Sequence, residues 1–166
     1  EAIDLKKKGV IKKIGVSLHS NQEINDVLKY KDIDLIQLPF NLFDNNNKRE
    51  KVFLKAKKLG IEIHTRSTFL QGLFFKDIDS LQGKLSVLKK YLEELKNLVG
   101  KEKINDLALN YAYSNSYIDA VLFGVDSIDQ LKSNISCINN NKFNHMFSNI
   151  DSINDEEEDM LNPVNW

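Results

Sequence analysis

The chain has 166 residues, of which 42% are hydrophobic and 28% are charged, and these values are typical of one globular domain with a buried core. Lys and Arg number 23 against 24 Asp and Glu, and this near balance excludes a global attraction to nucleic acid or to an acidic membrane surface. The sequence has no apolar run long enough to cross a bilayer and no secretory signal, so we expect a cytoplasmic location.

Four short segments rich in branched apolar residues have the length and character of buried strands. They are residues 13–18, 34–40, 61–67 and 118–125. Helical sequence follows each of them. A capping box that begins at Ser20 predicts a helix from there to about residue 30, and residues 48–59 predict a helix that Gly60 ends.

The connection after the third strand is longer than the others. Apolar residues with helical spacing predict one helix over residues 81–99, and residues 104–113 predict a second. The last strand leads directly into a predicted helix over residues 128–138. The acidic tail, residues 155–160, predicts one more short helix.

This alternation of strands and helices predicts an α/β fold with a parallel sheet, because parallel neighbours need crossover connections. Two architectures satisfy the pattern: an open sheet of the flavodoxin kind, or half of an eight-stranded barrel. In the third strand, Glu62, His64 and Arg66 alternate with apolar residues such as Ile61 and Ile63. A face this polar suits a barrel lumen better than a second layer of helices.

Polar residues gather at the carboxyl ends of the predicted strands, where α/β proteins build their sites. They are Ser17, Gln37, Arg66 and Ser67. Two loops, residues 67–72 and 124–127, are candidates for holding phosphate, and the second runs into a helix start. No His, Cys or carboxylate residues have a persuasive metal-ligand spacing, so we expect no metal.

Four stretches, in this order, resemble the aldo-keto reductase family, and the likeness covers nearly the whole chain. They are residues 9–17, which resemble the start of the family's fifth strand, and residues 36–41, 66–73 and 123–134. The resemblance implies that residues 1–166 are a single partial domain, the C-terminal half of a (β/α)8 TIM barrel with four β/α units and parallel strands. The Arg-Ser-x-Phe-Leu-Gln-Gly motif resembles a bacterial branch associated with sugar-related pathways.

The resemblance also implies which residues contact a nicotinamide cofactor. Ser17 and Gln37 match residues that bind the carboxamide, and Arg66 takes the place of an aromatic residue that stacks on the ring. The residues that match the pyrophosphate loop are Ser67, Phe69, Gln71 and Gly72. Those that match the segment around the adenosine are Gly124, Asp126, Gln130 and Asn134.

Three residues depart from the family pattern. Leu18 stands where an Asn commonly provides a second carboxamide contact. Gln130 stands where members that prefer NADP often have Arg, and Asp126 adds negative charge nearby. Both of the latter changes weaken the case for a 2′-phosphate, so the expected cofactor is NAD or NADP, with NAD favoured.

The resemblance implies a parent protein that is an NAD(P)H-dependent reductase, which transfers hydride between nicotinamide and a small carbonyl or alcohol substrate. The family's catalytic tetrad of Asp, Tyr, Lys and His lies in the other half of the barrel, so we expect no catalytic residue here and no activity of this chain alone. The alternative is a non-catalytic, cofactor-sensing or regulatory barrel subunit, and a third reading is a natural half-barrel that binds nothing in particular.

Half a barrel exposes the outer edges of its first and last strands and a lumen face without its partner. We therefore expect the chain to associate with the missing N-terminal half or with a second copy of itself.

Overall fold

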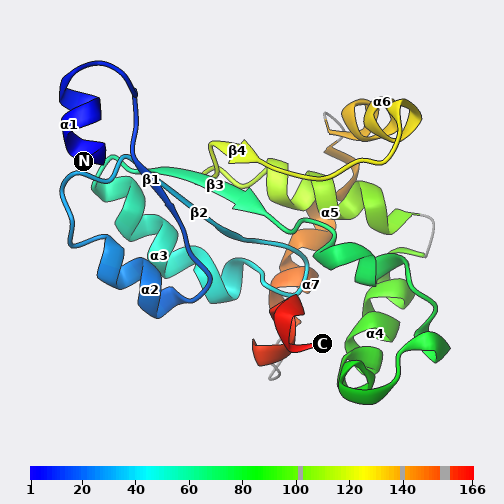
Figure 1. Ribbon diagram of the computed structural model, residues 1–166. Coiled ribbons are helices and arrows are strands. Elements are labelled where there is room, and N and C mark those ends of the chain that lie inside the picture. Colours follow the sequence, from blue (N-terminus) through cyan, green and yellow to red (C-terminus); the bar gives the residue numbers. More distant parts are fainter. Residues whose placement is uncertain (101–102, 139–140, 154–157) are drawn as a thin grey trace.

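Figure 1 shows the computed structural model, which describes residues 1–100, 103–138, 141–153 and 158–166. The strands form one sheet in the order β1-β2-β3-β4, and all neighbouring strands are parallel. Their bounds are Gly15–Ser17 for β1, Leu35–Pro39 for β2, Glu62–Arg66 for β3 and Ala120–Val121 for β4. All four predicted strands are therefore present in shortened form.

The order of the strands decides between the two architectures left open by the sequence. A doubly wound sheet of the flavodoxin kind reverses its strand order at a switch point, where its ligand binds. Here each strand pairs with the next strand along the chain, as in a barrel wall. The fold is thus α/β with four parallel strands and helices, consistent with a partial TIM barrel.

The two faces of the sheet have different environments. Ile36, Leu38 and Ile63 point to one face and are fully buried. Figure 1 shows α2 and α3 lying side by side along one side of the sheet, and α3 contacts β3. The register pairs Ser17 with Gln37 and Gln37 with His64, so these polar residues form one row on the opposite, more exposed face.

The helices largely agree with the expectations. Their bounds are Ala2–Lys7 (α1), Asn21–Val27 (α2), Asn46–Lys58 (α3), Lys89–Val99 (α4), Ile104–Tyr113 (α5), Ile128–Cys137 (α6) and Phe147–Ser152 (α7). The capping box at Ser20 and Glu23 is present, although α2 ends earlier than expected. Gly60 follows α3 in the left-handed conformation, with φ of +73°. Residues 155–157 of the predicted tail helix lie outside the described residues.

The single helix predicted over residues 81–99 is wrong. The chain is extended at Leu81 and Gln82, Gly83 has φ of +59°, and only then do a 3-10 segment, Gly83–Leu88, and α4 follow. A left-handed glycine interrupts a helix because its neighbours cannot continue the hydrogen-bond ladder. Leu81 is buried all the same, so the apolar spacing correctly predicted burial but not conformation.

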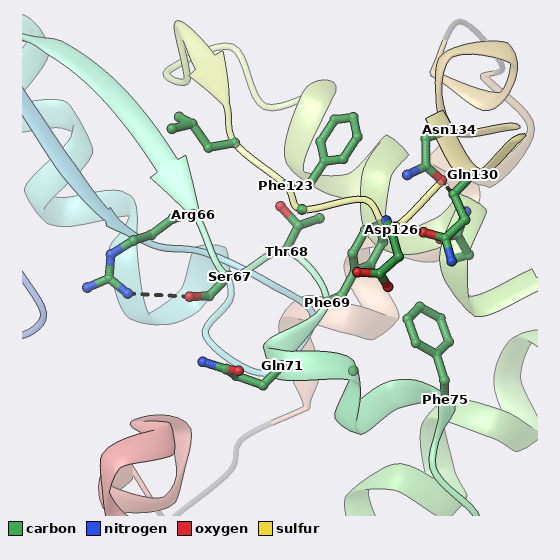
Figure 2. Close-up of a pocket in the computed structure, with 14 residues that line it drawn as sticks. Arg66, Ser67, Thr68, Phe69, Gln71, Phe75, Phe123, Asp126, Gln130 and Asn134 are labelled. Carbon is green, nitrogen blue, oxygen red and sulfur yellow. Dashed lines mark hydrogen bonds between the residues drawn. The ribbon is translucent and has the colours of Figure 1, made fainter. Parts of the chain in front are cut away.

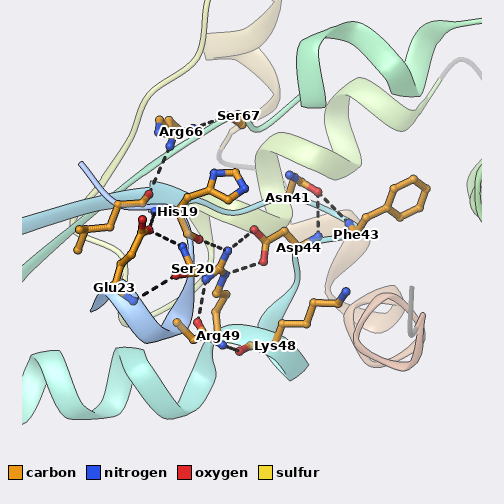
Figure 3. Close-up of polar contacts among 12 residues, drawn as sticks. His19, Ser20, Glu23, Asn41, Phe43, Asp44, Lys48, Arg49, Arg66 and Ser67 are labelled. Carbon is orange, nitrogen blue, oxygen red and sulfur yellow. Dashed lines mark hydrogen bonds and ion pairs between the residues drawn. The ribbon is translucent and has the colours of Figure 1, made fainter. Parts of the chain in front are cut away.

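A buried ion pair joins the loops that follow β1 and β2. The Arg49 guanidinium donates from Nε to Asp44 Oδ1 and from Nη2 to Asp44 Oδ2, each at 2.6 Å, and both side chains are almost fully buried. The same guanidinium donates to the backbone oxygen of His19 and to Asn21 Oδ1, each at 2.8 Å. Arg49 therefore fixes how the carboxyl ends of β1 and β2 lie relative to each other (Figure 3).

Two absences concern the described residues alone. Within the described ranges, no helix is both long and apolar enough to cross a membrane. In the same part of the chain, no group of three or more His, Cys, Asp or Glu side chains is arranged to hold a metal ion.

Replacing Arg49 tests the role of the buried pair. We expect Arg49→Met to lower the free energy of unfolding by about 3–5 kcal/mol, because it leaves the Asp44 carboxylate buried without its counter-charge. The matched control is Lys51→Met on the exposed side of α3, which should change stability by less than about 0.5 kcal/mol. Urea denaturation measures both. The double variant Asp44→Asn/Arg49→Met should recover part of the loss, and no recovery would contradict a charge effect.

Candidate functional site

A pocket of about 730 Å³ opens beside the carboxyl ends of β3 and β4 (Figure 2). This volume falls within the roughly 300–1,000 Å³ usual for small-molecule sites. Every site residue predicted at the end of β3, in the loops after these two strands and in α6 lines it. They are Arg66, Ser67, Phe69, Gln71, Gly72, Gly124, Asp126, Gln130 and Asn134. Two segments that are far apart in sequence are therefore brought together around one cavity.

The two other predicted contacts, Ser17 and Gln37, do not line this pocket. They lie on the neighbouring strands β1 and β2, on the exposed face of the sheet. Ser17 Oγ donates a hydrogen bond of 3.4 Å to Gln37 Oε1. Arg66 stands between the two groups, because it ends β3 and its partner in the register is Pro39, two residues beyond Gln37.

The loop after β3 has an unusual backbone. Ser67, Leu70 and Gln71 have φ of 61°, 45° and 54°, and these are the non-glycine residues with positive φ in the described part of the chain. Gly72 follows with φ of +78°. Left-handed conformations are unfavourable for residues with a side chain, and such positions cluster at ligand-binding and active sites. Turn hydrogen bonds from Leu70 N to Ser67 O and from Gly72 N to Phe69 O, both 2.9 Å, hold the loop.

Aromatic side chains form one wall of the pocket. The ring centroid of Phe69 lies 5.5 Å from that of Phe75 and 6.2 Å from that of Phe123. The sequence reasoning missed Phe75 and did not single out Phe123. Phe123 stands next to Gly124 in a stretch that resembles the family, which was a usable signal, whereas nothing in the sequence distinguishes Phe75 from a core residue.

The start of α6 forms another part of the lining. Ser127 caps this helix, since its side chain accepts a 3.1 Å hydrogen bond from the backbone N–H of Gln130. The Gln130 side-chain oxygen in turn accepts a 2.7 Å hydrogen bond from Asp126 N. The carboxamide of Gln130 is therefore held in place at its oxygen end.

A pair of amides lies deeper in the same wall. Asn105 Nδ2 donates a 3.2 Å hydrogen bond to Asn134 Oδ1, and Asn134 is 5% exposed. Asn105 comes from α5, which carries no family motif, so the sequence gave no reason to select it. Thr68 and Leu122 are the other lining residues that were not predicted. Thr68 Oγ1 is buried and has no hydrogen-bond partner within the described residues.

Charge is unevenly distributed around the pocket. Arg66 is the cation among its lining residues and Asp126 is the carboxylate. Arg66 donates long hydrogen bonds of 3.3 Å to Ser67 Oγ and to the backbone oxygen of Leu18. Burial, together with the charges of Arg66 and Arg49, lowers the pKa of nearby His19 below its ordinary value. Asp44 and Glu23 act on this pKa in the opposite direction. Arg66 thus contributes a positive charge to its end of the pocket.

The cap of α6 can be tested separately from ligand binding. We expect Ser127→Ala to lower the free energy of unfolding by about 1 kcal/mol, because the N–H group of Gln130 at the helix start loses its side-chain acceptor. Ser133→Ala on the exposed side of the same helix is the control and should be neutral or slightly stabilising. Thermal denaturation of both variants measures the difference, and equal effects would argue against the cap.

Comparisons with known proteins bear on the family and the fold. Residues 3–155 match the Aldo/keto reductase family. Two solved structures, the holo and apo forms of aldo-keto reductase AKR11C1 from Bacillus halodurans, superpose with a TM-score of 0.73 at 22% sequence identity. Both alignments cover 94% of this chain, which spans 56% of the first structure and 57% of the second. No curated protein matches the sequence.

At this identity the two structures support the fold alone, whereas the family match covers most of the sequence. The predicted family is confirmed, and its assignment to strands five to eight and to a bacterial branch stays a prediction. The chain belongs to the aldo/keto reductase family.

Proposed function

We propose that this chain supplies most of the nicotinamide-cofactor site of an NAD(P)H-dependent aldo-keto reductase, whose catalytic tetrad lies in another part of the barrel. The observation that supports this most is the pocket itself. It gathers the pyrophosphate-loop candidates after β3 and the adenosine candidates around α6 in one lining. The carboxyl ends of the strands are also where barrel enzymes bind the phosphate groups of their ligands.

The surroundings of Gly124 indicate whether a dinucleotide would fit in the pocket. A Cβ placed on Gly124 would meet no heavy atom within 4 Å, and its backbone is not in the left-handed region. Neither folding nor local packing therefore requires a glycine here. The absent side chain leaves open space in the pocket wall, next to the capped start of α6. Backbone N–H groups at a helix start attract phosphate, which agrees with a ligand that carries a pyrophosphate.

Each set of residues has a distinct part in this proposal. The cofactor, when bound, donates or accepts a hydride at its nicotinamide ring. Ser17 and Gln37 hold the carboxamide and so select the face of the ring that points to the substrate. The guanidinium plane of Arg66 stacks on the ring, and its charge favours the reduced, uncharged form over the oxidised cation. The loop of Ser67 and Gln71 lies along the pyrophosphate.

The adenosine end favours NAD. Asp126 contributes a carboxylate, and Gln130 contributes a neutral amide whose oxygen accepts from Asp126 N. A 2′-phosphate would need cationic donors, and the lining residues of this wall offer none.

A fluorescence titration of the chain with NADH tests the cofactor site. We expect binding without turnover of carbonyl compounds, and at least a tenfold rise in Kd for Gly124→Val, because the branched side chain would fill the space left by the glycine. Gly124→Ala should have a smaller effect, and neither variant should change the melting temperature by more than a few degrees. Unchanged NADH affinity in Gly124→Val would sink the proposed site, and turnover would show that the tetrad assignment is wrong.

A substitution of Gln130 tests the preference for NADH over NADPH. We expect the wild-type chain to bind NADH more tightly than NADPH, and Gln130→Arg to improve NADPH binding about tenfold relative to NADH through a charge-assisted hydrogen bond to the 2′-phosphate. Ser133→Arg on the exposed side of α6 adds the same charge outside the pocket and is the control. Tighter binding of NADPH by the wild-type chain would contradict the preference.

A further inference from the structure

Two carboxamides in the pocket lining are joined to each other. Asn105 comes from α5 and Asn134 from α6, and both line the pocket. Asn105 Nδ2 donates to Asn134 Oδ1 at 3.2 Å. The proposed function assigns no part to Asn105. This hydrogen bond therefore joins a cofactor-site candidate, Asn134, to a residue outside the proposed set.

The orientation of both amides is fixed. Besides its contact with Asn134, Asn105 Nδ2 makes a second, longer hydrogen bond of 3.4 Å to Asp106 Oδ1. An ionised carboxylate only accepts hydrogen bonds, so Asn105 has to present its nitrogen on this side. Asn134 then has to present its oxygen, because two amide NH2 groups cannot bond to each other. The Asn134 amide therefore has one orientation, with its nitrogen turned away from Asn105.

A second set of hydrogen bonds keeps α5 and α6 together. Asn110 is fully buried, and its Nδ2 donates to the backbone oxygens of Asp106 and Cys137, each at 2.8 Å. Cys137 Sγ donates to the backbone oxygen of Asn134 at 3.1 Å. These contacts do not involve the Asn105 side chain. A substitution of Asn105 should therefore release the Asn134 amide without moving α6.

The nitrogen of the Asn134 amide has no protein partner. Asn134 is 5% exposed, and in the part of the chain that the structure describes no hydrogen bond uses its Nδ2. Its Oδ1 has two lone pairs, of which Asn105 takes one. An almost buried donor is costly unless a ligand or a water molecule accepts from it. Asn134 therefore offers one donor and one acceptor, in a fixed order, to a ligand in the pocket.

An aromatic ring lines the same cavity. Phe75 is 42% exposed, and its ring centroid lies 5.5 Å from that of Phe69. In Figure 2, Phe75 and Asn134 reach the pocket from different elements, the segment after β3 and α6. An exposed ring is a surface on which any nucleobase can stack. The pocket thus combines a face contact that does not distinguish bases with an edge contact that has a fixed direction.

A fixed amide distinguishes purines that differ at position 6. Adenine has a donor there, its amino group, beside an acceptor nitrogen, and an amide binds both at once with its oxygen toward the amino group. Hypoxanthine has an oxygen at position 6, which would meet the Asn134 oxygen as a second acceptor. Only a reversed Asn134 amide would suit hypoxanthine, and the hydrogen bond from Asn105 opposes that reversal.

We propose that Asn134 binds the edge of the adenine base, that Phe75 stacks on its face, and that Asn105 is a positioning residue that makes the site selective for a 6-aminopurine. The inference rests on the proposed function, because it concerns the base of the same dinucleotide. It goes beyond that function in assigning base selectivity to a hydrogen bond between two protein side chains. Selectivity is a ratio of two affinities, so it can be measured apart from affinity itself.

The test is a fluorescence titration of the full 166-residue chain with NADH and with reduced nicotinamide hypoxanthine dinucleotide. The two probes carry the same nicotinamide and differ in the base alone. We expect the wild-type chain to bind NADH about tenfold more tightly than the hypoxanthine probe. Equal affinities would overturn this inference and leave the cofactor proposal standing. Absence of NADH binding would end the cofactor proposal and this inference with it.

Substitutions of Asn105 test its positioning role. Asn105→Leu has a similar size and removes the donor, so the Asn134 amide can turn, and the hypoxanthine probe should bind nearly as tightly as NADH. Asn105→Asp replaces the donor by an acceptor, so the reversed amide and the hypoxanthine probe should be favoured. Asn149→Leu, at an exposed position of α7 outside the pocket, is the matched control and should keep the wild-type ratio. A wild-type ratio in Asn105→Leu would overturn the positioning role.

Phe75→Leu provides a measurement that does not depend on how the Asn105 variants fold. It removes the stacking surface and leaves both amides, so it should weaken the binding of both probes about tenfold and keep their ratio. Unchanged affinities, or a loss of affinity for one probe alone, would contradict stacking on Phe75. Melting temperatures of all variants, measured without ligand, should lie within a few degrees of the wild-type value.

Discussion

Parallel pairing of β1, β2 and β3 in a fixed register determines where each side chain of the sheet lies. Because side chains alternate along a strand, one face must accommodate Ile36, Leu38 and Ile63, and only helices can cover it. The same register places Ser17, Gln37 and His64 in one row on the other face. A shift of one residue would bury the polar row and expose the core, so the position of the candidate site and the stability of the fold depend on one constraint.

The parts of the fold that follow from local rules could be read from the sequence. The capping box of α2, the left-handed glycine after α3 and the strand alternation of β3 each depend on a few neighbouring residues. The connection after β3 could not, since Gly83 is compatible with several conformations and only tertiary packing selects one. The apolar residues on either side of Gly83 are buried whether the chain is helical or extended. Their spacing therefore does not distinguish a helix from an extended segment.

The residues of the candidate site likewise divide into those that a sequence motif predicts and those that no motif marks. Residues in motifs, such as those of the loop after β3, were predicted and do line the pocket. Asn105 and Phe75 were missed because they reach the pocket from elements without a motif. The contacts of Arg49 with His19 and Asn21 were beyond the sequence as well, because they join segments that only the sheet brings together.

The left-handed residues in the loop after β3 have a consequence for how this protein tolerates change. An L-residue at positive φ holds conformational free energy that depends on its side chain, so substitution of Ser67 or Gln71 by glycine or asparagine would relax the backbone, while β-branched residues would strain it further. Selection for stability alone would therefore replace these residues. Their retention would require a selective benefit from the side chains themselves, so the variation tolerated at these two positions would separate the demands of folding from those of ligand binding.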